Sequence, residues 1–225
     1  DKNYSENGYI WDVNFRIMGQ DPLASHQVEF LYQGNDNSSN YYEFEHKTSF
    51  TKMLNCDLRL WNNGPCIPSN MENVDNFRGT VRIKSDLPIA VVVQLFSSNK
   101  LLGNYRGLSS EEASRQIFMP VLNKNYGPFG DAIGWNSSFR VFTFDGSQSR
   151  IKKYFFSNKG KNISEISMTL NREKTFHQQD NSLIDNKWVG SGYIVADKPV
   201  VAVVYLFNEN FEGDNLLMYN AVSLE

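Results

Sequence analysis

The stretch WVGSGYIVADKPVVAVVYLF (188–207) decides the architecture, because FRGTVRIKSDLPIAVVVQLF (77–96) follows the same pattern 188 − 77 = 111 positions earlier. Two further stretches, 11–32 and 135–156, align without a gap at a shift of 135 − 11 = 124. The chain therefore consists of two copies of one unit, and such internal repeats take precedence over local signals in assigning a fold.

The two shifts differ by 124 − 111 = 13, so the first copy has thirteen additional residues between its matching stretches. Cys56 and Cys66 lie in that interval, separated by a turn-forming run, Asn-Asn-Gly-Pro (62–65). A longer surface loop and a functional loop both fit this insertion, since loops carry both variation and function. Because this run can bring the two ends of the loop together, we predict a disulfide between the two cysteines.

Each copy shows a period of two, in short runs rich in Val, Ile, Phe and Tyr that are separated by Gly, Asn, Asp and Pro. This pattern is typical of antiparallel strands. Six or seven strands per unit of about one hundred residues predict an all-β chain of two tandem antiparallel β-sandwich (Ig-like) domains, 1–112 and 113–225. The Asp-x-Pro runs at 86–88 and 197–199 are expected to be tight connections between adjacent strands.

The copies differ at their beginnings. The second copy has a predicted strand, RQIFMPVL (115–122), that runs into NKNY, whereas the first copy begins directly at DKNY. The first sandwich is therefore expected to lack one strand. Two explanations stay open: the sequence is cut from a longer chain, or the vacant edge is a socket for a neighbouring subunit.

Composition argues against several classes of function. The chain has 22 basic and 25 acidic residues, a net charge of −3, and no block of like charge. Nucleic acid and anionic lipid are therefore not expected as partners. The longest apolar run, 200–207, has eight residues, far short of a membrane span.

No cofactor is expected. Two cysteines and three histidines argue against a Cys/His metal cage. The oxygen-rich runs at 34–37 and 145–147 suit calcium, but their spacing does not match a dedicated calcium loop and turn chemistry explains them equally well.

Catalysis is not expected either. Asp21, Ser25 and His26 lie close in sequence, yet alternate residues of a strand point to opposite faces, and the second copy has Ser149-Arg150 at the matching place. The recurring Arg16 and Arg140 are interpreted as structural, each in a salt bridge to Asp21 or Asp145. We therefore expect a protein that is not an enzyme.

Carbohydrate binding is the alternative function, because exposed aromatic side chains can stack on sugar rings. The candidate stacking residues are Trp61, Tyr41, Tyr42 and Trp188. Four sequons also make Asn3, Asn37, Asn136 and Asn162 candidate glycosylation sites, which would suit a surface protein.

The second copy resembles the tandem repeats of large secreted surface proteins of Chloroflexota-type bacteria. The resemblance lies in IFMPVLNKNY (117–126), WNSSFRV (135–141), WVGSGYIVADKPVVAVV (188–204) and MYNAV (218–222). It is weaker in the first copy, where Tyr105-Arg106-Gly107 replaces the closing motif. The resemblance implies an extracellular, structural module of a surface layer (S-layer), sheath, filament or adhesin stalk. Its partners would be further copies or neighbouring repeats of the same protein, or glycans.

Overall fold

The computed structural model describes residues 4–6, 9–35, 40–58, 65–71, 74, 76–98, 101–127, 134–160, 162–208 and 215–224. The chain is all-β: the helices within these residues are short 3-10 turns at Ser69–Met71, Ser110–Glu112 and Gln178–Asp180. None of these helices is long or apolar enough to cross a membrane. The chain divides into two compact units, Asp1–Gly107 and Leu108–Glu225. The division falls five residues before the expected boundary at 112.

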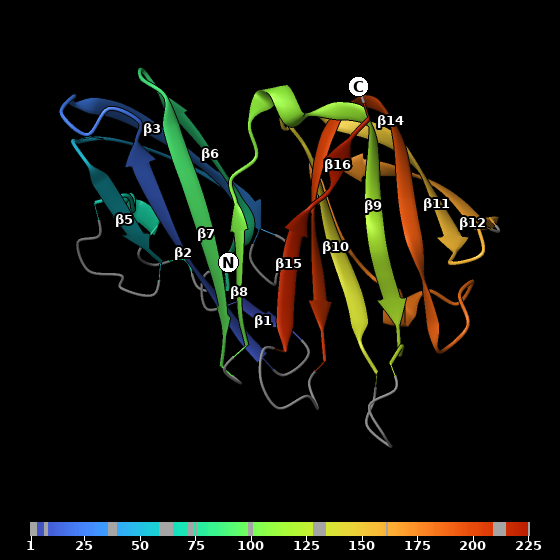
Figure 1. The fold of residues 1–225 in the computed structure, drawn as a ribbon. Coiled ribbons are helices and arrows are strands. Elements are labelled where there is room, and N and C mark those ends of the chain that lie inside the picture. The colour runs from blue at the N-terminus through green and yellow to red at the C-terminus, as the bar shows by residue number, and fades with distance from the viewer. Residues whose placement is uncertain are drawn as a thin grey trace. The chain divides into compact units, whose positions relative to one another are not determined.

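The first unit contains two antiparallel sheets (Figure 1). One has the order β1-β2-β7-β8, with β5 also paired to β2, and the other has the order β4-β3-β6. The strands are β1 (Tyr4–Glu6), β2 (Tyr9–Gly19), β3 (His26–Asn35), β4 (Tyr41–Phe50), β5 (Met53–Asp57), β6 (Arg78–Ser85), β7 (Ile89–Ser97) and β8 (Leu102–Arg106). Because side chains alternate along each strand, one face of each sheet contributes to a single apolar core.

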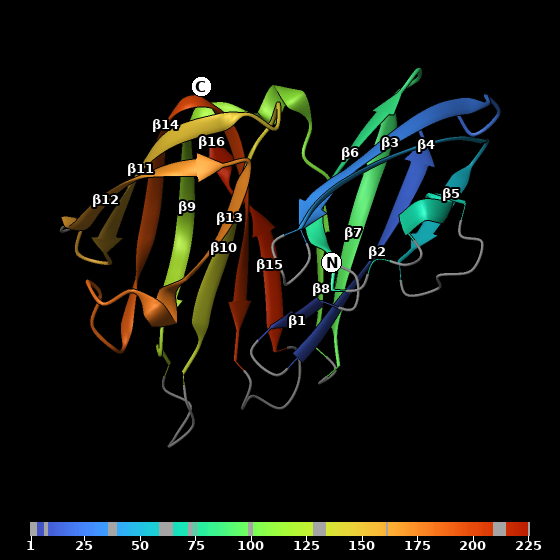
Figure 2. The ribbon, with the colours of Figure 1, turned by 180° about the vertical axis from the view of Figure 1, so that it is seen from behind.

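One long strand, β14 (Trp188–Phe207), runs through the sheet of the second unit and is seen from behind in Figure 2. Its first half pairs with β11 and β9, and its second half pairs with β10 and β15. The other strands are β9 (Ser114–Lys124), β10 (Asn136–Thr143), β11 (Gln148–Ser157), β12 (Asn162–Asn171), β13 (Glu173–His177), β15 (Leu216–Asn220) and β16 (Val222–Ser223).

The Asp-x-Pro run at 86–88 is a short connection between consecutive strands, as expected, whereas the run at 197–199 is not. Residues 86–88 join β6 to β7, which belong to different sheets, and residues 197–199 lie inside β14. The aspartates hold these two segments against neighbouring strands. Asp86 accepts a hydrogen bond from the Gln27 backbone N–H, and Asp197 accepts one from the Arg150 backbone N–H, both at 2.8 Å.

The alignment of the two copies is gapless only as far as the first turn. Phe15 and Phe139 pair with Val93 and Val204, which confirms the shift of 124 in β2 and β10. In the next strand Phe30 pairs with Ile83 and Lys153 pairs with Ile194, so the shift there is 153 − 30 = 123. The turn is one residue shorter in the second copy. A strand register that is off by one would exchange the buried and exposed faces, so burial favours the gapped alignment.

Most of the additional residues of the first copy follow β5. Cys56 pairs with Phe15 and Phe176 pairs with Phe139, which gives a shift of 176 − 56 = 120. Because the shift falls to 111 by β6, nine additional residues lie between β5 and β6. They include Cys66, whose segment packs into the first core.

Candidate functional site: the β6 edge of the first unit

Strand β6 forms an edge where the second unit has another strand. In the second unit, β14 lies between β11 and β9, and Ile194 pairs with both Lys153 and Ile117. The corresponding residue of β6, Ile83, pairs with Phe30 of β3. Among the strands that the structure describes, β6 pairs with β3 alone. The expectation that the first unit lacks a counterpart of the 115–122 strand therefore agrees with the pairing.

In the described residues, apolar side chains near this edge are partly uncovered. Ile194, Ala202 and Val204 of β14 are 0%, 1% and 0% exposed. Their counterparts Ile83, Val91 and Val93 are only half-buried, although they pack against the first core. Side chains at corresponding positions are thus buried in the second unit and only partly buried in the first.

Strand β9 shows what would cover them. Its residues Ile117, Met119 and Leu122 are fully buried in the second core. The Tyr219 hydroxyl of β15 donates a hydrogen bond to the Val121 carbonyl, which fixes β9 from its neighbour. Burial raises the pKa of Tyr219 well above its ordinary value, so the phenol remains a donor. Tyr105 occupies the corresponding register position in the first unit, opposite Val93.

The outer face of the β6 edge is basic. Arg82 and Lys84 alternate with the inward Val81 and Ile83, and Lys84 pairs in register with Glu29 of β3. Charged residues on an edge strand limit indiscriminate pairing with other chains. The inward side of the same edge is apolar, because Val81 and Ile83 pack against the first core.

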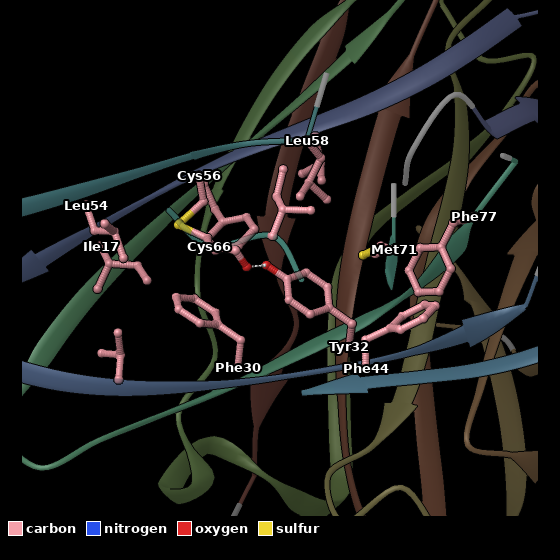
Figure 3. Packing of buried hydrophobic residues seen from close by; sticks show 14 of the residues in the cluster. Ile17, Phe30, Tyr32, Phe44, Leu54, Cys56, Leu58, Cys66, Met71 and Phe77 are labelled. Carbon is pink, nitrogen blue, oxygen red and sulfur yellow. Dashed lines mark hydrogen bonds between the residues drawn. A yellow bond between two sulfur atoms is a disulfide. The ribbon is translucent and has the colours of Figure 1, made fainter. Parts of the chain in front are cut away.

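The disulfide predicted between Cys56 and Cys66 is present, and both residues are fully buried. The Tyr32 hydroxyl donates a 2.6 Å hydrogen bond to the Cys66 carbonyl (Figure 3). Burial raises the pKa of Tyr32 far above its ordinary range. The cysteine insertion thus fills the first core.

The candidate stacking residues differ in accessibility. Tyr41 is 44% exposed and donates a hydrogen bond to Glu43, whereas Tyr42 is half-buried and stacks on Phe44. Trp188 is only 8% exposed, because its ring folds over Gly190, so it offers no platform to a sugar. Trp61 lies outside the described residues.

The candidate glycosylation sites are also placed unequally. Asn136 is 2% exposed, and its amide bonds the Asn125 side chain and the Gly134 carbonyl, so the folded chain does not present it to a glycan. Asn162 lies at the start of β12. Asn3 and Asn37 lie outside the described residues.

The polar residues considered for catalysis have structural contacts. His26 is fully buried, stacks on Phe50 at 5.1 Å and contacts the Asp21 carbonyl through Nε2 at 2.9 Å. Arg140 pairs with Glu173 at 2.6 Å rather than with Asp145 as expected, and Arg16 is exposed. These contacts position strands and turns.

The turns that suited calcium are also explained locally. Asp145 accepts hydrogen bonds from the Ser147 backbone and side chain, which hold the pKa of its carboxyl below the ordinary value. Within the described ranges, no cluster of three or more His, Cys, Asp or Glu residues could hold a metal ion. Of the other run, Asp36 and Asn37 lie outside the described part of the chain.

No family model matches the sequence, and no curated protein matches it. Among solved structures, the chain is similar to the crystal structure of Thermotoga maritima 1070, with 17% identity and a TM-score of 0.41. That similarity covers 50% of this chain and 97% of the other. It is too weak to support a conclusion about fold or function.

Proposed function

We propose that the chain is a non-catalytic structural module of an extracellular surface layer, sheath, filament or adhesin stalk. Each unit would be an immunoglobulin-like β-sandwich, related to the secreted repeats that its second copy resembles. The observation that carries this proposal is that, among the described strands, β6 pairs with β3 alone, while Ile83, Val91 and Val93 are only half-buried. The buried disulfide is consistent with an oxidising compartment outside the cytoplasm.

The edge would join modules by strand addition. An extended segment gains main-chain hydrogen bonds from the edge, and its alternate side chains fill the space above the core. The required pattern is that of β9, with apolar residues at the inward positions. Since β9 is already paired with β14 and β16, we propose that a repeat of the same surface protein on a separate, neighbouring chain supplies the strand. Such a head-to-tail contact propagates into a filament unless its rotation closes a ring.

A peptide of residues 115–124 (RQIFMPVLNK) tests this proposal. It should protect the amides of 78–85 from hydrogen exchange, with a dissociation constant on the order of 1–100 μM. Changing Ile117 and Met119 to Asp in the peptide should abolish protection. The peptide carrying Val121→Asp is the matched control, because Val121 is 41% exposed in β9 and its side chain lies outside the core.

A fused strand provides the second arm. Residues Asn123-Lys124-Asn125-Tyr126 correspond to Asp1-Lys2-Asn3-Tyr4, so adding 115–122 directly ahead of Asp1 reproduces the β9 register without a linker. The fusion should protect β6 and block the free peptide. Absence of protection in both arms would overturn the proposal. Protection by the fusion alone would show that the edge takes its strand from the same polypeptide, which contradicts assembly between chains.

A further inference from the structure

A buried lysine replaces a core aromatic residue in the second unit. Lys153 of β11 occupies the register position of Phe30, since they pair with the corresponding residues Ile194 and Ile83. Phe30 is 0% exposed and Lys153 is 6% exposed. A lysine at a core position is unusual, because its charge must leave water. The sequence alone did not single out Lys153, because the gapless alignment matches Phe30 with Tyr154 instead.

Lys153 lines a cavity of about 330 Å³ in the second unit. Phe155, Ile166, Phe176 and Leu183 form apolar parts of its lining, and Thr175 and Asn181 are among its polar residues. In the first unit the corresponding positions are filled differently: Tyr32, the counterpart of Phe155, bonds to Cys66, and Cys56 replaces Phe176. The cavity therefore lies where the second unit lacks the cysteine insertion.

The ammonium group of Lys153 has no counter-ion among the described residues. It lies over the Phe176 ring, whose centroid is 3.5 Å from Nζ. Burial, with a smaller contribution from Lys174, lowers the pKa of Lys153 to about 8. Asp180 also lines the cavity but forms no ion pair with Lys153. Buried charges are normally paired, so this cation lacks the partner that burial requires.

We propose that this cavity binds a small organic carboxylate. Its carboxylate would pair with Lys153 Nζ, and its body would lie against Ile166 and Phe176, within reach of Thr175 and Asn181. An acidic monosaccharide has a suitable combination of a carboxylate, hydroxyls and an apolar ring face. This site is separate from the β6 edge, and the inference does not depend on assembly through that edge.

Site-specific amine labelling tests the inference on the full chain. Acetylation of Lys153 and Lys152 is followed by peptide mass spectrometry in the presence of acetate, glucuronate or neutral glucose. Glucuronate should slow labelling of Lys153 at least fivefold, acetate should slow it more weakly, and glucose should have no effect. Lys152 is the internal control, because it is exposed on the same strand and pairs with Glu165 at 3.3 Å.

Variants separate binding from folding. In calorimetric titrations with glucuronate, Lys153→Met should lose binding at least tenfold, whereas Lys152→Met should bind as the parent does. Thermal melting should show that both variants are folded, since the first unit already has an apolar residue at this position. Unprotected Lys153 with both carboxylates, or equal glucuronate binding by parent and Lys153→Met, would overturn the inference.

Discussion

Removal of the buried disulfide should selectively destabilise the first unit. In the variant Cys56→Ala/Cys66→Ala, the segment that packs against Tyr32 is no longer tied to β5. The bond joins residues ten positions apart. In the chain-entropy model its loss raises the entropy of the unfolded chain and so lowers the free energy of unfolding by about 3 kcal/mol. Tyr32 is fully buried, and a hydroxyl that loses the Cys66 carbonyl costs about 1–3 kcal/mol more.

The expected total, about 4–6 kcal/mol, is a large part of the 5–15 kcal/mol that stabilises a typical domain. Urea unfolding followed by circular dichroism should show a lower midpoint for the variant, and hydrogen exchange should assign the loss to 26–58. Tyr32→Phe keeps the disulfide and should lose only about 0.5–1.5 kcal/mol. The parent should carry no thiol that can be alkylated without reductant. If the double variant stays within 0.5 kcal/mol of the parent, as a rough limit of measurement, the loop argument is refuted.

Three further variants probe separate features. Lys153→Met should be more stable than the parent by about 1–3 kcal/mol at pH 7, because burial depresses the folded-state pKa of the lysine to about 8. Since the folded parent loses this proton before the unfolded chain does, its stability should rise between pH 8 and about 10.5 and the variant's advantage should shrink, which urea titrations at several pH values can measure. Gly190→Ala should cost several kcal/mol, on the order of the larger core effects, because the added Cβ would lie 1.9 Å from the Phe156 carbonyl oxygen. Gly160→Ala is its control, since nothing lies within 4 Å and only its positive φ of 73° opposes the change, so thermal melting that ranks the two equally would contradict the packing argument. Asp197→Asn should lower the melting temperature at neutral pH, because hydrogen bonds from Ser149 and then the Arg150 backbone hold the pKa of Asp197 below its ordinary value. That stability exists above the unfolded-state pKa and is lost as pH falls through the folded-state pKa, so parent and variant should converge in acid.

The sequence could predict the features that repeat. The duplicated Gly, Asp and Pro positions, the period-two runs and the extra strand ahead of NKNY were sufficient to predict two all-β units that differ, among the described strands, in the pairing of β6 and β14. Cys56 and Cys66 could be paired because few residues separate them. These signals are local, or compare one stretch of the chain with another.

Other features depended on contacts that the sequence does not display. The single-residue difference after β2 hid the correspondence of Lys153 with Phe30, because a gapless alignment matches residues of opposite faces. Trp188 looked like a surface aromatic residue, yet Gly190 leaves room for its ring to fold inward. Arg140 forms an ion pair with Glu173 of the neighbouring strand β13, rather than with Asp145, which is nearer in sequence.

The continuous strand β14 has a mechanical consequence. Tension along it would load the ladders with β11 and β9 and those with β10 and β15 together, so the two halves of the second unit should yield in one event. In the first unit the same path is interrupted at 86–88, between β6 and β7. Among the described strands β6 pairs with β3 alone, so a pull on β6 would load that ladder, and the three-stranded sheet should open first when the chain is stretched.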